Sequence, residues 1–308
     1  MIRQRLCRWL VDRFAGEKRM HGRLLTTHTV PRWLAGLALV LCVALPRMAW
    51  AQTPSPLQEW QYPGGTILEK LYEPNTADWR VVLGAAVISE PRYDGGLAYH
   101  VTPGPVIVVL YKDIAFASVG EGVGVNLFHG DKYRAGVSVG YDLGRYMSDD
   151  WDHLHGLGNI DAAPVVKAFA SYVVSRSFPL VFRADVRRII GGSDGLLGDF
   201  SAFMPLPGSS KKFVMFAGPS VTFSDRQYDR KVFGVDAAQA ADSVYPVYNA
   251  HGGLTAVGMG FSASRFITDH WLVNADLAWN RLEGSASASP ITQSNEQGVI
   301  EFSTEYRW

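Results

Sequence analysis

Tyr133-Arg-Ala-Gly-Val-Ser-Val-Gly-Tyr-Asp-Leu143 alternates strictly between two kinds of side chain. One set of positions holds tyrosine, alanine, valine and leucine, and the other holds Arg134, glycine, serine and Asp142. Successive side chains of a β-strand point to opposite faces, so a period of two over these eleven residues is typical of a strand. The segment therefore predicts a strand with one apolar face and one polar face.

The same alternation recurs from residue 79 to the end of the chain. Strands are expected at residues 79–89, 98–111, 114–127, 132–146, 161–175, 180–190, 196–204, 212–223, 254–266, 271–282 and 297–308. These are eleven segments, whereas single-chain bacterial barrels have even numbers of strands. One strand is therefore missed or miscut, either at residues 59–72 or at the break Gly120-Glu121-Gly122. We expect twelve strands, with ten as the alternative.

Three features favour a membrane barrel over a soluble β-sandwich. The apolar faces often begin or end in Tyr or Trp, as the aromatic girdles at membrane interfaces do. The polar faces carry charges and glycines, which suit a lumen. The last strand carries Phe302, Tyr306 and Trp308, and its aromatic end is similar to the insertion signal of bacterial outer-membrane barrels. We expect an all-β, antiparallel transmembrane barrel over residues 79–308, because only closure satisfies every backbone group in lipid.

Residues 1–51 have the composition of a targeting segment. They hold nine of the 29 basic and two of the 29 acidic residues, which leaves 20 basic and 27 acidic residues and a net charge of −7 in the rest of the chain. The apolar run Trp33–Leu45 has 13 residues, whereas a membrane-spanning helix needs about 20. Ala49 and Ala51 form a small-x-small cleavage pattern. We expect a signal peptide cleaved after Ala51 and a periplasmic lead, residues 52–78, before the barrel.

Both cysteines, Cys7 and Cys42, lie in the targeting segment. The mature chain is therefore expected to contain no disulfide, no cysteine-based zinc site and no cysteine nucleophile. Its negative net charge argues against nucleic-acid binding. The expected location is the outer membrane of a Gram-negative cell, in contact with lipid and lipopolysaccharide, after insertion by the barrel assembly machinery.

Counting back from the last strand assigns each connection to one side of the membrane. Residues 283–296, 224–253, 191–195 and 147–160 are expected to face outward, and residues 267–270, 205–211 and 176–179 to form short periplasmic turns. Long outer loops and short periplasmic turns are typical of such barrels. The 30-residue loop 224–253 is rich in aromatic residues, which indicates either a folded cap or a partner surface.

The densest polar cluster lies in one of the outward loops. Its members are Asp149, Asp150, Asp152, His153 and His155. Carboxylate oxygens and imidazole nitrogens at this spacing could bind a divalent cation. A solvated acidic loop, which meets lipopolysaccharide through bridging cations, is the simpler interpretation, so no metal site or cofactor is assigned.

Charged side chains on the polar faces are expected to point into the lumen. They are Arg134, Asp142, Arg183, Asp185, Arg187, Asp276, Glu301, Glu305 and Arg307. A charge buried alone costs several kcal/mol, so these groups must pair or be hydrated. The pattern predicts a salt-bridge network that rigidifies a narrow barrel, and the alternative is a charged lining that selects a solute.

Catalysis is not expected. Ser220, Ser262 and Ser264 lie on polar strand faces, and His251 precedes a strand. The chain has no Gly-x-Ser-x-Gly elbow and no spacing that places a histidine beside a serine with an orienting acid. These serines are therefore interpreted as packing residues.

Several short stretches, in this order and spacing, resemble the MipA/OmpV family of outer-membrane proteins. They are Gly124-Val-Asn-Leu127, Gly156-Leu-Gly-Asn-Ile-Asp161, Phe169-Ala-Ser-Tyr172, Arg183-Ala-Asp-Val-Arg187, Gly218-Pro-Ser220 and Phe233-Gly-Val-Asp-Ala-Ala-Gln-Ala240. The resemblance implies an outer-membrane barrel that acts as a scaffold for peptidoglycan remodelling and bridges a lytic transglycosylase and a penicillin-binding protein. It implies no catalytic residues. Roles in envelope stress or adhesion, or a small-solute channel, remain the alternatives.

Overall fold

Twelve β-strands form a closed barrel in the computed structural model, which describes residues 78–175, 177–210 and 212–308. The strands are β1 (Trp79–Pro91), β2 (Tyr99–Tyr111), β3 (Ala115–Ser118), β4 (Gly122–His129), β5 (Tyr133–Asp142), β6 (Ala163–Val173), β7 (Val181–Ile189), β8 (Leu196–Pro205), β9 (Phe213–Ser224), β10 (Gly253–Phe266), β11 (Trp271–Leu282) and β12 (Glu296–Arg307). The predicted signal peptide, its cleavage residues Ala49 and Ala51, and the lead up to residue 77 lie outside the described residues.

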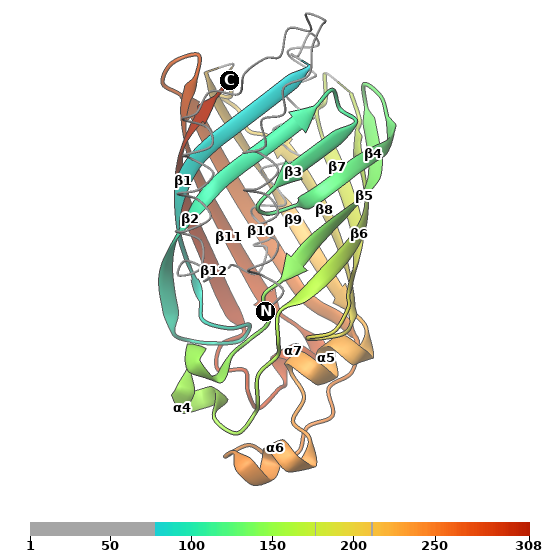
Figure 1. The fold of residues 1–308 in the computed structure, drawn as a ribbon, viewed down its shortest axis with the longest axis vertical. Helices are drawn as coiled ribbons and strands as arrows, with labels where there is room; N and C mark the ends of the chain where they lie inside the picture. Colours follow the sequence, from blue (N-terminus) through green and yellow to red (C-terminus); the bar gives the residue numbers. More distant parts are fainter. Residues whose placement is uncertain (1–77, 176, 211) are drawn as a thin grey trace, which may run out of the picture. The chain divides into compact units, whose positions relative to one another are not determined.

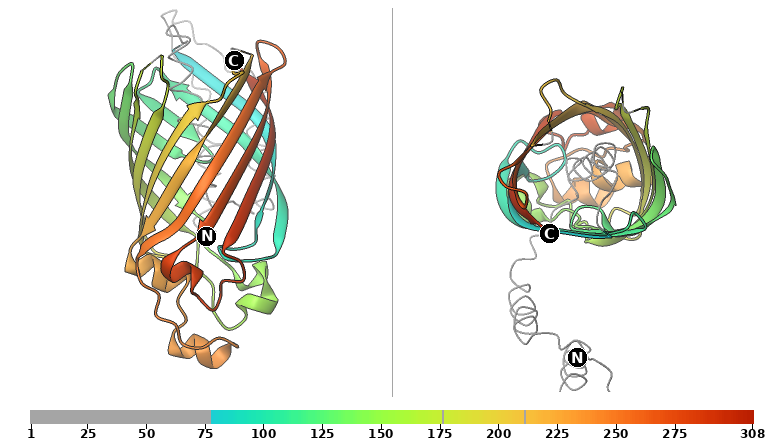
Figure 2. Two further views of the ribbon diagram at one scale, coloured as in Figure 1. Left: turned by 180° about the vertical axis from the view of Figure 1, so that it is seen from behind. Right: turned by 90° about the horizontal axis from the view of Figure 1, so that it is seen from above.

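Each strand pairs antiparallel with its neighbours in the sequence, and the first strand closes the sheet onto the last (Figure 1). β1 pairs with β12 from Val82↔Arg307 to Ser89↔Ile300. Viewed along the barrel, the strands form a ring (Figure 2). The prediction of a twelve-stranded antiparallel barrel is therefore confirmed.

The strand that the alternation pattern missed lies at one of the two places named for it. The expected strand 114–127 is two strands, β3 and β4, separated by a turn at residues 119–121. The expected strand 132–146 was too long, because β5 ends at Asp142. Gly144, with φ of +72°, turns the chain there, and its N–H donates to Asp142 Oδ1 at 2.8 Å.

The outer surface of the barrel is apolar and the inner surface is polar. On β5, Tyr133 and Val137 are exposed, whereas Arg134 and Ser138 are buried. β11 and β12 alternate in the same sense. A soluble protein buries its apolar side chains, so this reversed pattern requires lipid around the sheet.

Exposed aromatic side chains mark both rims of the apolar surface. At the end where the chain terminates they are Trp79, Tyr133, Tyr172, Trp271 and Trp308, and at the opposite end they are Tyr99, Tyr141 and Trp279. Amphipathic rings are enriched at the two membrane interfaces. The aromatic residues therefore place the two membrane boundaries at the two ends of the strands.

The connections that carry helices gather at the end opposite the C-terminus, which we call the helical end (Figure 1). They contain η1 (Met147–Asp149), α4 (Trp151–Leu154), α5 (Arg226–Val232), α6 (Ala237–Asp242) and α7 (Gly284–Ser287). The other end, where β1 begins and β12 ends, we call the terminal end. No helix in the described parts of the chain is long and apolar enough to cross a membrane.

Candidate functional site

The lumen contains a carboxylate held by two basic side chains. Glu121, in the turn between β3 and β4, is only 3 % exposed. Its Oε1 accepts a hydrogen bond from Arg183 Nη2 at 2.9 Å, and its Oε2 accepts one from Lys167 Nζ at 3.3 Å. The pairing offsets the cost of removing these charges from water. We call Glu121, Lys167 and Arg183 the central ion cluster.

Local backbone geometry brings Glu121 into the lumen. Its N–H donates to Ser118 Oγ at 2.9 Å, which closes the turn. Gly122 has φ of +76°, and a Cβ at that position would lie 2.2 Å from the backbone oxygen of Val139 on β5. Only glycine fits there, so the turn packs directly against β5 and directs Glu121 inward.

The basic residues of β7 have further carboxylate partners outside the central ion cluster. Arg183 Nε lies 3.6 Å from Asp185 Oδ2, and the Arg183 guanidinium lies over the Phe169 ring at 5.4 Å from its centroid. Arg187 Nη2 lies 2.7 Å from Asp199 Oδ2 on β8. The structure thus brings Arg183, Asp185 and Arg187 together on one side of the lumen.

Arg134 pairs with a residue from a turn at the terminal end. Its guanidinium contacts the carboxylate of Asp113, and both side chains are buried. Asp113 has φ of +94°, in the turn after β2. Asn126 Nδ2 donates to the Asp113 backbone oxygen at 2.7 Å and so supports this turn.

Acidic side chains gather on a different part of the wall. Asp276 on β11 and Glu301 on β12 are cross-strand partners, only 1 % and 2 % exposed. Asn274 Nδ2 donates to Asp276, and Ser303 Oγ donates to Glu305 Oε1 at 2.6 Å. Carboxylates therefore gather on β11 and β12, whereas the basic side chains of β6 and β7 are paired with Glu121, Asp185 and Asp199.

The proposed insertion signal lies at the seam of the barrel. Phe302 and Trp308 are exposed on the outer surface, and the Tyr306 and Trp308 ring centroids are 4.4 Å apart. Trp308 N–H donates to the Val81 backbone oxygen at 3.0 Å. Arg307, predicted to line the lumen, is half-buried, with its guanidinium 4.8 Å from the Phe266 ring centroid.

Sequence reasoning missed four of the charged partners in this network, namely Asp113, Glu121, Lys167 and Asp199. Glu121 had a recognisable signal, because it lies between two glycines at a suspected strand break. Lys167 and Asp199 each interrupt a largely apolar strand. A charge at such a position predicts a partner across the lumen.

A cavity of about 140 Å³ lies between the central ion cluster and the helical end. Its charged part is lined by Glu121, Lys167 and Arg187, and its apolar part by Tyr228, Phe233 and Leu282. The chamber therefore has a charged side and an apolar side.

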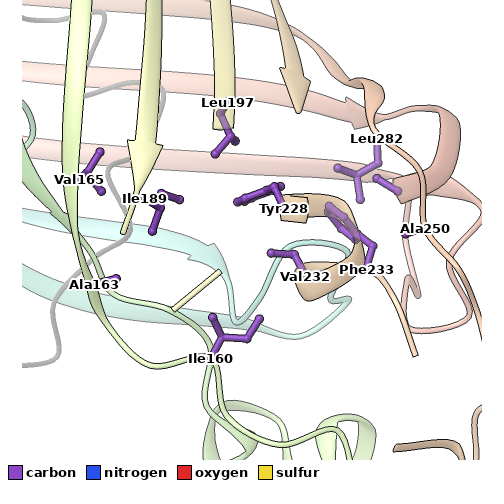
Figure 3. Packing of buried hydrophobic residues seen from close by; sticks show 11 residues of the cluster. Ile160, Ala163, Val165, Ile189, Leu197, Tyr228, Val232, Phe233, Ala250 and Leu282 are labelled. Atoms are coloured by element: carbon purple, nitrogen blue, oxygen red, sulfur yellow. The ribbon is translucent and has the colours of Figure 1, made fainter. Parts of the chain in front are cut away.

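Helix α5 covers the cavity at the helical end (Figure 3). Its Tyr228 and Val232, together with Phe233, point toward Val165, Ile189, Leu197 and Leu282 on the surrounding strands. The N-terminus of α5 is capped by Asp225, whose Oδ1 accepts the Tyr228 N–H at 2.8 Å. Hydrophobic packing and capping together fix this helix over the lumen.

Asp229 anchors the same helix to the strands. It is buried, and Ser224 Oγ donates to its carboxylate while also contacting Thr255 Oγ1 at 2.5 Å. Burial raises the pKa of Asp229 to about 6; the Ser224 hydrogen bond opposes this shift and nearby Asp225 adds to it.

Contacts between loops make the helical end a folded cap. Arg145 Nη1 donates to the Val232 backbone oxygen at 2.8 Å, and Ser289 Oγ donates to the Phe233 oxygen at 2.6 Å. In the view along the barrel, helices of the cap lie across its opening (Figure 2). Of the two interpretations of residues 224–253, the structure shows the folded cap.

In the acidic cluster of residues 149–155, the side chains contact near neighbours in the sequence. His153 Nδ1 lies 3.0 Å from Asp150 Oδ1, and Asp149 Oδ2 accepts the Tyr146 N–H at 2.7 Å. Within the described ranges, no group of three or more His, Cys, Asp or Glu side chains is arranged to hold a metal ion.

Ser264 and His251, two of the residues considered for hydrolysis, form hydrogen bonds with different partners. Ser264 Oγ donates to Asn274 Oδ1 at 2.6 Å. His251 is exposed before β10, and its backbone N–H donates to Ser285 Oγ at 2.7 Å. A serine nucleophile needs a histidine within hydrogen-bond reach, and the partner of the Ser264 hydroxyl is Asn274 instead.

A closed antiparallel sheet with an apolar exterior, two aromatic rims and a charged lumen defines an integral outer-membrane β-barrel. The model of the family described as "MltA-interacting protein MipA" matches residues 83–308. The chain therefore belongs to the MipA family, as the short sequence stretches indicated.

Comparison with the curated proteins found no match. Among solved structures, the chain is similar to the translocator domain of the autotransporter NalP from Neisseria meningitidis, at 12 % identity and a TM-score of 0.39, covering 81 % of this chain and 96 % of that one. It is also similar to an anion-selective porin from Comamonas acidovorans, at 9 % identity and a TM-score of 0.33, covering 75 % and 98 %.

Proposed function

We propose that the protein is a non-catalytic scaffold in the outer membrane of a Gram-negative cell, which binds a lytic transglycosylase and a penicillin-binding protein on its periplasmic side. Membership in the MipA family carries this proposal, because the family's description names an interaction with MltA. Lipid and lipopolysaccharide surround the barrel, and the barrel assembly machinery inserts it.

The filled lumen supports binding rather than bulk transport. The central ion cluster lies in the lumen, and the α5 cap lies over the cavity beyond it. Side chains that occupy the interior of a twelve-stranded barrel reduce the space left for a pore. In a barrel of this kind, the exposed surfaces at the two ends are the places where a partner can bind.

The terminal end is the side we assign to the periplasm, because long loops of outer-membrane barrels face outward. Its connections are short turns, among them residues 130–132 and 267–270. They expose Lys132 and Asp269, and β1, which the predicted lead 52–78 precedes in the sequence, begins at this end. A periplasmic enzyme can reach only these parts.

Deletion of residues 52–75 tests the scaffold function. We expect the shortened protein to remain a folded barrel, shown by its heat-modifiable mobility, and to capture less transglycosylase from crosslinked envelopes than the unshortened protein. A tagged unrelated barrel is the control for nonspecific capture. Equal capture by the two forms would contradict a role for the lead.

The turns can be tested separately from the lead. Reversing the charge of exposed Lys132 at the terminal end should weaken capture, whereas the same reversal at exposed Arg281, near the helical end, should not. Equal loss in both variants would indicate a general effect on assembly rather than a periplasmic binding surface.

A small-solute channel is the second candidate, and the charged residues on the inner wall favour it. Arg183 and Arg187 on β7 and Asp276 and Glu301 on β11 and β12 belong to the inner wall, where charged groups would act on a solute in the lumen. Neutralising Arg183 and Arg187 should then change ion selectivity in planar bilayers. Absence of measurable conductance in the unmodified protein would rule this candidate out.

A further inference from the structure

On one side of the barrel wall, between β2 and β5, the hydrogen-bonded pairing of neighbouring strands is incomplete. We call this part of the wall the interval. β2 pairs with β1 along its whole length, from Tyr99 to Tyr111. On its other edge it pairs with β3 only from Val108 to Tyr111, and one more hydrogen bond joins Val119 N–H to the Ile107 oxygen at 3.3 Å. Within the described parts of the chain, residues 99–106 have no strand on that edge.

The opposite margin of the interval is the end of β5. β4 pairs with β5 only up to Val139, so Gly140, Tyr141 and Asp142 pair with β6 alone. The short β3 and the turn that carries Glu121 bound the interval toward the terminal end. Figure 1 shows this interval between the lower parts of β2 and β5.

Two prolines make the open edge of β2 a poor template for another strand. The Ile107 oxygen points to this edge, and Pro103 and Pro105 are in phase with Ile107, so their backbone groups face the same side. Proline has no N–H, so the edge lacks two donors that an added strand would need. Proline on an edge strand is a common device against strand pairing.

The interval lies at the depth of the membrane and is continuous with the lipid-facing surface. Tyr99 and Tyr141, on its two margins, belong to the aromatic rim at the helical end. Val101 is exposed below that rim, on the same outer face. With the helical end outward, the interval therefore opens into the outer leaflet of the membrane.

The turn and the end of β5, which bound the interval on two sides, also line the lumenal cavity. Gly120 and Glu121 of the turn contribute to its lining, and so do Gly140, Tyr141 and Asp142 of β5. Beyond them the cavity continues to apolar side chains beneath α5, among them Phe233 and Leu282. An apolar group that enters between β2 and β5 would pass Glu121 and Asp142 and then reach an apolar surface beneath α5.

We propose that this interval is a lateral opening, through which the end of an acyl chain of an outer-leaflet lipid enters the cavity beneath α5. The cavity, of about 140 Å³, accepts only the end of a chain, because an apolar cavity of about 150 Å³ holds one benzene molecule. This site is independent of the periplasmic surfaces assigned to partner binding. It makes the barrel a receptor for a lipid at its outer side.

Reconstitution with a phospholipid that carries a photoreactive diazirine at the end of its acyl chain tests the opening. After illumination, mass spectrometry locates the modified residues. We expect adducts on lumen-facing residues beside the interval, such as Thr102, and on the cavity residues Tyr228 and Phe233. Lumen-facing Ser264, where β10 is paired on both edges, is the internal control and should carry none.

Two matched substitutions locate the entry point. A Cβ at Gly140 would have no atom nearer than 3.9 Å, and one at Gly198, which faces outward on β8, none nearer than 3.8 Å, so both positions accept a side chain. Gly140→Phe fills the mouth of the cavity and should reduce cavity adducts at least fivefold, whereas Gly198→Phe should leave them unchanged.

Other results would overturn the proposal. Adducts confined to outward-facing residues in the unmodified protein would show that the wall excludes lipid. Cavity adducts that persist in Gly140→Phe would show another route of entry. Since the unmodified protein supplies the first result, the conclusion does not depend on whether the substituted barrels assemble.

Discussion

Glu121 Oε1 and Arg183 Nη2 lie 2.9 Å apart inside the lumen, although 62 positions separate the two residues in the sequence. One comes from a turn between two short strands and the other from the middle of β7. Their contact links the turn to β7, which lies beyond β5 and β6 in the sheet. It therefore connects the internal charge network to the lateral interval beside that turn.

Removing Arg183 should destabilise the barrel strongly. Arg183→Ala leaves the buried Glu121 carboxylate with a weaker set of partners, and breaking a buried pair costs about 3–5 kcal/mol. Urea unfolding in lipid vesicles measures this loss. Arg188→Ala is the control, because the Arg188–Asp194 pair is well exposed and an exposed pair contributes about 1 kcal/mol or less.

A second substitution distinguishes loss of charge from loss of packing. Adding Glu121→Gln to Arg183→Ala removes the buried negative charge, so the double variant should recover part of the stability lost by the single one. No recovery would show that Arg183 acts through its packing on Phe169 instead.

The α5 cap should be more stable in acid than at neutral pH. The pKa of Asp229 in the folded protein is about 6, raised from 3.8 by burial, so the native state binds the proton more tightly than the unfolded state. The stabilisation is fully present below pH 3.8 and is lost as the pH rises through 6. By neutral pH the loss is at most about 3 kcal/mol.

Amide hydrogen exchange of residues 226–232, corrected for the intrinsic rates, measures this change. Protection should fall between pH 5 and pH 7. Asp229→Asn should remove the pH dependence while keeping a polar partner for Ser224. An unchanged pH dependence in that variant would assign the effect to another group.

Truncating Phe233 should loosen the cap without opening the barrel. Phe233 is 2 % exposed within the cluster beneath α5, and a buried Phe→Ala change costs about 3–5 kcal/mol. Exchange should therefore accelerate in α5 while the strand amides stay protected. Val244→Ala, at a fully accessible loop position, is the matched control. Equal acceleration in the strands would mean that cap and barrel unfold together.

Loss of Trp308 should slow assembly more than loss of another girdle residue. Trp308 ends the chain at the seam, where its N–H donates to the Val81 oxygen, and the aromatic end is the predicted insertion signal. We expect deletion of Trp308 to reduce folded protein in the outer membrane several-fold. Trp79→Ala removes a comparably exposed aromatic residue from the same rim. Similar losses in the two variants would favour a general girdle effect.

Much of the barrel could be predicted from local pattern. The inward and outward faces of β5, β11 and β12 follow from period-two alternation, because the backbone of a strand itself places successive side chains on opposite sides. The even number of strands follows from closure by antiparallel pairing alone, because neighbouring strands must alternate in direction around the whole ring. The boundary at Asp142 was missed because Gly144 turns the chain within a segment that still alternates.

The candidate site was predictable only in part. Arg134, Arg183 and Asp276, which were expected in the lumen, are buried, and the face on which a strand residue lies is a local property. The partners Glu121 and Asp199 were missed. Which charges meet depends on the register of strands that are far apart in the sequence and on a turn that folds inward.

The sequence by itself therefore determined the class of structure, the alternation of its strand faces and membership in the MipA family. Only the tertiary structure decided that Glu121 joins Lys167 and Arg183, that α5 caps the cavity, and that the wall between β2 and β5 is incomplete. The physical reason is the separation in the sequence over which each effect acts. Alternation acts between neighbouring residues, whereas pairing, capping and closure require segments brought together by the whole barrel.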